Sequence, residues 1–165
     1  MANKIISFSL STKEINRAIK EVEKYKQELI RKEKLLLEKL SYLGVKEASV
    51  RFTTAMYDGV NDSNVSLEQT PTGYSIVASG TAVAFIEFGA GVYHNSSEPY
   101  PNPRPEGIVG IGEYGKGHGK RRAWGYKDES GELVITRGNP ATMPMWYATE
   151  EMRRSILQIA REVFS

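Results

Sequence analysis

The stretch of sequence that decides the fold reads STKEINRAIKEVEKYKQELIRKEKLLLEKLSYL and occupies residues 11–43, without a single glycine or proline. A heptad spacing within it joins Ile15, Val22, Leu29, Leu36 and Leu43. This spacing gives a helix one apolar face, Ser11 with Glu14 three residues later is a typical helix start, and Gly44 is a typical helix end. We therefore expect one long helix over residues 11–43. At about 1.5 Å per residue it would be a rod of about 50 Å, longer than a compact domain of this size is wide.

Residues 45–88 pass from a helical spacing to an alternation of apolar and polar residues. The helical spacing predicts a second short helix, whose apolar residues are Val45, Ala48, Phe52 and Ala55. Alternating runs at 65–68 and 74–79 predict two strands, and Pro71 and Gly73 supply the turn between them. Residues 83–88 are apolar on both faces until Glu87, which predicts a third, central strand. Together these strands would form an antiparallel β-meander.

Residues 89–143 are rich in glycine and proline and predict an irregular arm followed by a hairpin. The hairpin would pair residues 122–127 with residues 132–137 around a turn at 128–131. Residues 144–165 predict a final helix that begins near Pro144, because proline suits the first turn. Its apolar face is Met145, Met152, Ile156, Ile159 and Val163, which we expect to pack on the meander. The sequence thus predicts a single α+β domain over residues 1–165, with a C-terminal helix packed on the sheet.

Composition narrows the classes of protein further. The chain has 165 residues, of which 40% are hydrophobic and 25% charged, as in an ordinary globular domain. The absence of cysteine removes disulfides, Cys-based zinc sites and thiol nucleophiles. We expect no membrane span and no secretory signal, so the protein would be made inside the cell. A net charge of +2 is too small to indicate DNA binding by bulk electrostatics.

Two motifs in the glycine-rich part have competing interpretations. Residues 110–115 match the spacing of a dinucleotide-binding fingerprint, but the glycines that follow them disfavour the helix that phosphate binding needs. A loop is the preferred interpretation. Lys116, Lys120, Arg121 and Arg122 form a basic cluster. With Trp124 and Tyr126 after it, the cluster suits either a nucleic-acid backbone or a solvated loop, and both remain open.

Glu87 is the strongest candidate for a residue with a special role. As a catalytic base it would need a partner acid, a histidine or a metal in reach, and the sequence offers no convincing set. We expect instead a buried carboxylate that accepts N–H bonds from the following glycine turn or pairs with an arginine. The sequence therefore predicts no enzyme, no metal site and no cofactor.

The order of motifs resembles the neck, or tail-completion, proteins of long-tailed bacteriophages. The resemblance rests on FIEFGAG at 85–91, EYGKG at 113–117, Trp124, RGNPA at 137–141 and MPM at 143–145. It implies a non-enzymatic virion protein of the head–tail connector, made in the host cytoplasm and without a cofactor. Such proteins form a homo-oligomeric ring, six-fold to match the tail, between the head-closure or adaptor proteins and the tail tube or terminator. The ring surrounds the DNA channel.

The resemblance also assigns roles to parts of the chain. The turn at Glu87 and the arm after it become candidate subunit contacts, with Glu87, Phe88, Gly89, Tyr93, Tyr100, Ile108 and Ile111 as their residues. Lys116, Lys120, Arg121 and Arg122 become candidates to face DNA in the channel. Loops longer than about 15 residues are uncommon in free domains, so ordering by a neighbour would explain an arm over 91–121. The alternatives are a tail-terminator or minor tail protein and, in another class, an accessory nucleic-acid-binding protein.

Overall fold

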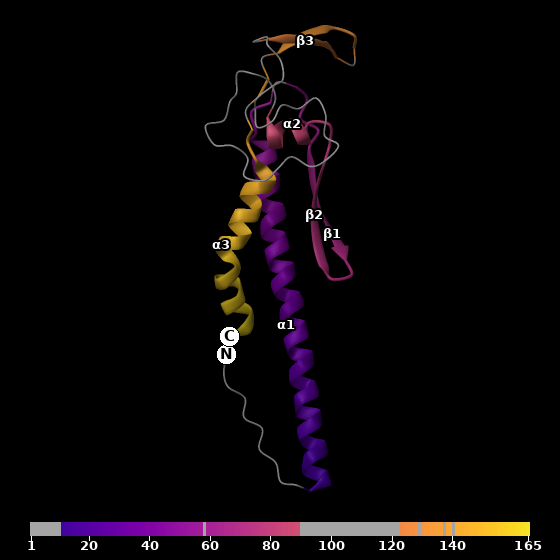
Figure 1. The fold of residues 1–165 in the computed structure, drawn as a ribbon, viewed down its shortest axis with the longest axis vertical. Helices are drawn as coiled ribbons and strands as arrows, with labels where there is room; N and C mark the ends of the chain where they lie inside the picture. The colour runs from indigo at the N-terminus through magenta and orange to yellow at the C-terminus, as the bar shows by residue number, and fades with distance from the viewer. Residues whose placement is uncertain (1–10, 58, 90–122, 129, 137, 140) are drawn as a thin grey trace.

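The structure is a computed structural model that describes residues 11–57, 59–89, 123–128, 130–136, 138–139 and 141–165. Its elements are α1 (Thr12–Thr53), β1 (Asn64–Thr70), β2 (Gly73–Ser79), α2 (Val83–Phe88), β3 (Trp124–Lys127), β4 (Leu133–Thr136) and α3 (Pro144–Phe164). Figure 1 shows α1 as a long rod, with α3 and the β1–β2 hairpin beside it. α2 and the β3–β4 hairpin lie at its C-terminal end. The predicted α+β class is confirmed.

Helix α1 is longer than the sequence predicted. It runs unbroken for 42 residues, or about 63 Å, so the expected end at Gly44 and the separate short helix after it are both wrong. Gly44 instead allows close packing, because a Cβ there would collide with Ile76 of β2 and lie 2.5 Å from the sulfur of Met152 in α3. The start of the helix is confirmed, since the Ser11 hydroxyl accepts the Glu14 N–H at 3.3 Å.

Of the predicted meander only the β1–β2 hairpin is present, and the further hairpin predicted after residue 122 is present as β3–β4. β1 pairs with β2 in antiparallel register, with Val65 opposite Ala78 and Leu67 opposite Ile76, and β3 pairs with β4 in the same sense. The predicted central strand over 83–88 is wrong, because these residues form the helix α2. A short apolar run cannot be told from a buried helix by periodicity alone. Asp62, which lies outside the run, accepts the N–H groups of Thr81 and Ala82, the two residues just before the helix.

The main core lies where the C-terminal end of α1 meets α2 and α3. Its buried residues are Ala48, Phe52, Ala82, Ile86 and Ala148, with Val65 and Ala78 of the hairpin packed against them. Because these residues come from three helices, the core holds α2 between the hairpin and the start of α3. This packing fixes the position of Glu87, the residue that follows Ile86.

Helix α3 lies mainly along α1, and Met152 of α3 and Ile76 of the β1–β2 hairpin both lie against Gly44. The expectation that Ile156 is buried is wrong, since 44% of this residue is exposed. Val163 is buried, and Met145, Met152 and Ile159 are partly buried. A single rod such as α1 covers a narrower strip of a neighbouring helix than a broad sheet would, and Ile156 falls outside that strip.

The core assignment predicts unequal effects of the same substitution at two isoleucines. Ile86 is fully buried, so Ile86→Val should lower the free energy of unfolding by about 0.5–1.5 kcal/mol. Ile156→Val, at an exposed position, should change it by no more than about 0.5 kcal/mol. Urea melts followed by circular dichroism would measure both. A larger loss at Ile156 than at Ile86 would show that the packed face of α3 is wrongly placed.

Candidate functional site

Glu87 caps helix α3 from a different element of the fold. Its side chain comes from α2 and is only 3% exposed. One carboxylate oxygen accepts the Met145 N–H at 2.8 Å and the other accepts the Trp146 N–H at 3.1 Å. N–H groups in the first turn of a helix have no partner within the helix, and a negative charge there is favoured by the helix dipole. The predicted buried carboxylate with N–H donors is present, with both of these donors in α3 and not in the glycine turn.

The segment before α3 caps α2 in return. The Asn139 side-chain amide, itself buried, donates to the Phe85 carbonyl at 2.7 Å. The Thr142 N–H and hydroxyl both donate to the Ile86 carbonyl, at 2.9 and 3.0 Å. Carbonyls in the last turn of a helix need such outside donors. Each helix is therefore completed by the other helix or its flanking residues, and we call this arrangement, residues 85–89 with 139–146, the junction.

Gly89 brings the two sides of the junction into direct backbone contact. Its φ of +75° lies in the region that favours glycine. A Cβ at this position would lie 2.7 Å from the Ala141 nitrogen and 3.1 Å from the Asn139 carbonyl oxygen. The chain therefore leaves the body at Gly89 and returns to the same point at Asn139. Gly89 and Asn139, which are far apart in the sequence, therefore touch.

Sequence reasoning found only one side of the junction. Glu87, Phe88 and Gly89 are all buried within the chain, with 6% exposure for Phe88. The roles of Asn139 and Thr142 were missed, and the only local signal was the turn expected of an Asn-Pro pair. The other candidates lie outside the described residues, so their contacts with subunits or DNA stay predictions. They are Tyr93, Tyr100, Ile108, Ile111, Lys116, Lys120, Arg121 and Arg122.

A second carboxylate, Asp62, holds the start of α2. One of its oxygens accepts the Thr81 N–H at 2.7 Å and the Thr81 hydroxyl at 2.8 Å, and the other accepts the Ala82 N–H at 2.8 Å. Hydrogen bonds from the Ala82 and Thr81 N–H groups, then from the Thr81 hydroxyl, lower the pKa of Asp62 from 3.8 to about 2. The neighbouring Asn61 donates to the Phe52 carbonyl at 2.8 Å, which ties the same loop to the end of α1.

The lowered pKa of Asp62 predicts a loss of stability in acid. Because the folded pKa lies below the unfolded one, the carboxylate contributes fully above about pH 4, and its contribution is lost as pH falls through about 2. Asp62→Asn should therefore make the unfolding free energy less dependent on pH in this window. Urea melts between pH 5 and about 2 would measure the slope. Glu68→Gln, which removes an exposed carboxylate on β1, is the control, and equal slopes for the two variants would contradict the assignment.

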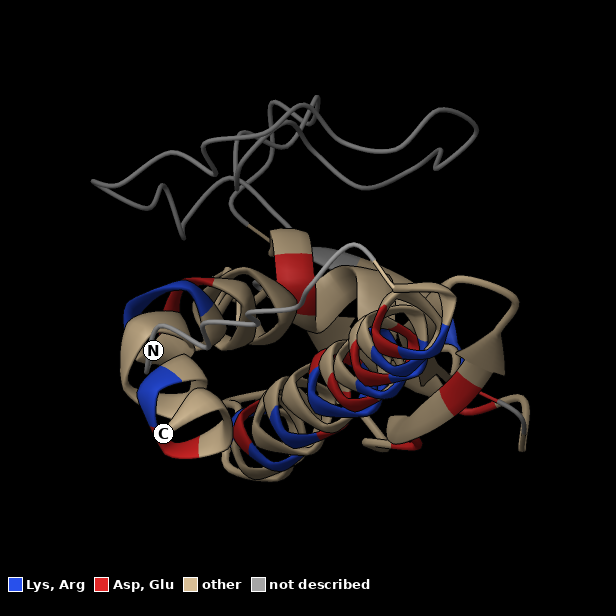
Figure 2. Cartoon of the chain, turned by 90° about the horizontal axis from the view of Figure 1, so that it is seen from below, with Lys and Arg blue, Asp and Glu red and all other residues tan. Residues whose placement is uncertain are grey.

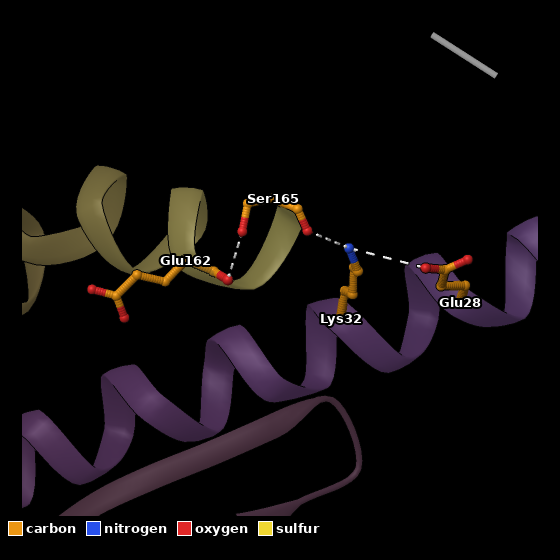
Figure 3. Close-up of polar contacts among 4 residues, drawn as sticks. All are labelled: Glu28, Lys32, Glu162 and Ser165. Carbon is orange, nitrogen blue, oxygen red and sulfur yellow. Dashed lines mark hydrogen bonds and ion pairs between the residues drawn. The ribbon is translucent and has the colours of Figure 1, made fainter. Parts of the chain in front are cut away.

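The N-terminal part of α1 is a second candidate site. α3 ends opposite Lys32, whose ammonium donates to the Ser165 carbonyl at 3.3 Å and lies 4.0 Å from Glu28 (Figure 3). The tip of the β1–β2 hairpin, at Gly73, reaches only to Leu37. α1 continues beyond both neighbours (Figure 1). We call residues 12–31 the free end of α1.

The free end carries apolar side chains on its surface. Ile15, Ile19 and Val22 are 37%, 51% and 55% exposed. Their spacing of four and three residues puts them on one face, and Leu36 and Leu40 continue the same face within the body, where they are partly buried. Lysine, arginine and glutamate lie side by side along the rest of the helix, as Figure 2 shows. On this side of the free end Ile15, Ile19 and Val22 are therefore exposed, while Ala18 is buried and Leu29 is partly buried.

No other site chemistry is found in the described ranges. Within them, no group of three or more His, Asp or Glu residues could hold a metal ion. None of the helices in the described part of the chain has the length and apolar character needed to cross a membrane.

The chain matches no family model, no curated protein and no solved structure.

Proposed function

We propose that this protein is a structural subunit of the head–tail connector of a long-tailed bacteriophage. Its subunits would form an oligomeric ring that joins the head-closure proteins to the tail tube around the DNA channel. The observation that carries the proposal is the free end of α1, a rod with the exposed apolar residues Ile15, Ile19 and Val22. Contiguous apolar surface of this kind is typical of sites where proteins associate. The motif order, which resembles that of neck proteins, supports this kind of assembly.

The junction supports a structural role for the motif on which the resemblance rests. Both oxygens of Glu87 accept backbone N–H bonds, so the carboxylate is engaged in holding α2 against α3. Gly89 and Asn139 lie against each other. Contacts of the residues between Gly89 and Asn139 with a neighbouring subunit would then leave the packing of α1, α2 and α3 unchanged. The proposal accordingly gives the chain no catalytic role and places it in the virion neck.

A second candidate, an accessory nucleic-acid-binding protein, is favoured by a different face of α1. Lys13, Arg17, Lys20 and Lys24 are all exposed and recur at helical spacing. Such a row suits a phosphate backbone, which would be bound without sequence specificity. The glutamates between these cations weaken the case, because they repel phosphate along the same helix.

The mass and shape of the purified protein in solution test the proposal. We expect sedimentation at rising concentration, without DNA, to give a closed oligomer, and electron microscopy to show rings. These rings should bind both emptied heads and tail tubes. Rings that bind tubes alone would favour a tail terminator. A monomer that binds DNA with a steep salt dependence would favour the nucleic-acid-binding candidate and contradict the proposal.

A further inference from the structure

We infer that one face of α1, a stripe of exposed lysines and arginines, binds the phosphate backbone of duplex DNA. The inference deepens the proposed function, because it assigns the surface of the subunit that faces DNA. It rests on that function only for the place of this surface in the channel. Most of the stripe lies where α1 continues beyond α3 and the β1–β2 hairpin (Figure 1).

The stripe follows the helical repeat without interruption. Steps of four and three residues alternate from Lys13 to Lys34, and this spacing keeps side chains on one face of a helix. All seven positions are exposed, and six of them are Lys or Arg. We call them the basic stripe: Lys13, Arg17, Lys20, Lys24, Gln27, Arg31 and Lys34. No member is acidic, although residues 12–34 contain five glutamates.

The glutamates of this part of α1 lie on other faces of the helix. Four of them border the stripe, about 40–60° around the helix from its nearest members: Glu14, Glu21 and Glu28 on one side and Glu23 on the other. Glu28 is 4.0 Å from Lys32, outside the stripe. In the described part of the chain, Arg17 is the one cation of the stripe in an ion pair, 3.6 Å from Glu14 and exposed. Such exposed pairs are weak, so the stripe keeps a continuous row of one sign.

The composition of the stripe favours a nucleic-acid backbone over a protein partner. The stripe contains no apolar or aromatic residue, and lysine is depleted from the buried centres of protein interfaces. Duplex DNA carries one negative charge for about every 1.7 Å of its axis. Lysine and arginine bind these phosphates without reading the sequence of bases. A row of cations alone is therefore suited to DNA of any sequence.

The length of the stripe also matches duplex DNA. From Lys13 to Lys34 the stripe extends for about 32 Å along an unbroken helix. One turn of the duplex is about 34–36 Å long. A straight helix laid along the duplex therefore passes both phosphate backbones within the length of the stripe.

The stripe and the exposed apolar residues occupy different sides of α1. Ile15 and Val22 each stand two positions before a cation of the stripe, Arg17 and Lys24. Two positions are about 200° around a helix, so these side chains point to nearly opposite sides. A subunit contact through Ile15 and Val22 would therefore leave the basic stripe open to DNA.

The salt dependence of DNA binding tests the inference on the full chain. Lys20→Gln with Lys24→Gln should reduce the slope of log K against log salt by about 1.8, because each phosphate contact contributes about 0.9. At about 50 mM salt this variant should bind about tenfold more weakly, or weaker still. Duplexes rich in A·T and in G·C should bind equally. Fluorescence anisotropy with a labelled duplex of about three turns measures these quantities, and circular dichroism verifies that each variant is helical.

A matched control removes the same charge from other faces of the same helix. Lys26 and Lys46 are both exposed and lie outside the stripe, so Lys26→Gln with Lys46→Gln should leave the slope unchanged. Lys116→Gln with Lys120→Gln tests the other basic cluster of the chain. Equal slopes for wild type and the stripe variant would overturn the inference. A loss as large in the Lys26 and Lys46 control, or a loss only in the Lys116 and Lys120 variant, would also overturn it.

The oligomeric state separates this inference from the proposed function. Rings that bind DNA through the stripe support both. Rings whose DNA binding is unchanged in the stripe variant, or that bind no duplex at low salt, overturn the stripe and leave the connector standing. A monomer whose DNA binding is lost with the stripe contradicts the connector and leaves the stripe as the DNA-binding surface.

Discussion

Glu87→Ala should lower the free energy of unfolding by about 3–6 kcal/mol. The substitution leaves the N–H groups of Met145 and Trp146 without their charged acceptor, and a hydrogen bond to a charged group contributes about 1.5–3 kcal/mol. A loss of this size is a large part of the total stability of an ordinary domain, about 5–15 kcal/mol. Guanidinium melts followed by far-ultraviolet circular dichroism would measure it.

Glu87→Gln provides the graded comparison. The amide keeps one acceptor for the start of α3 and turns the other into a donor, so about 1.5–3 kcal/mol should be lost. The order wild type, Gln, Ala is the signature of a capping carboxylate. A loss below about 1 kcal/mol for Glu87→Ala would contradict the cap, and an enzymatic turnover lost specifically in Glu87→Gln would contradict a structural role.

Gly89→Ala should cost about 2–6 kcal/mol, the second large effect. A φ of +75° strains any residue with a Cβ by about 1–3 kcal/mol. The added carbon would also lie 2.7 Å from the Ala141 nitrogen, and forcing extra volume into a packed site costs a further 1–3 kcal/mol or so. Backbone on both sides cannot move aside as a flexible side chain could. Guanidinium melts provide the measurement.

Gly131→Ala is the matched control for this second effect. Gly131 has a similar φ of +84°, but a Cβ there would meet nothing within 4 Å. Only the backbone strain applies, so Gly131→Ala should cost clearly less than Gly89→Ala. Equal losses in the two variants would mean that the close approach to Ala141 adds nothing and that the junction is looser than described.

Local signals in the sequence were sufficient for much of the fold. The N-cap at Ser11, the β1–β2 and β3–β4 hairpins and the proline start of α3 were all predicted, because each depends on neighbours in sequence. The predictions that were wrong concern residues whose contacts lie far away in the sequence. Gly44 reads as a helix end until Met152 and Ile76 are seen to pack against it. The apolar run at 83–88 is predicted as a strand until Asp62 is seen to bind the N–H groups of Thr81 and Ala82, just before the helix.

At the candidate site, too, the sequence predicted what depends on neighbouring residues and missed what depends on distant ones. An unusual carboxylate at Glu87 could be singled out from its position between an apolar run and a glycine turn. Its donors could not, since Met145 lies 58 residues further along the chain. Asn139 reads as part of an ordinary turn because its partner, the Phe85 carbonyl, lies 54 residues away. A sequence can show that a polar residue stands in an unusual position, but its hydrogen-bond partner is known only from the fold.

The meeting of Gly89 with Asn139 and Ala141 has a consequence for how this protein can change over generations. Gly89 and Asn139 stay close whatever number of residues joins them, and the entropic cost of closing a loop rises by only about 0.6 kcal/mol for each doubling of its length. The contacts among α1, α2 and α3 can then stay the same when the number of residues between Gly89 and Asn139 changes.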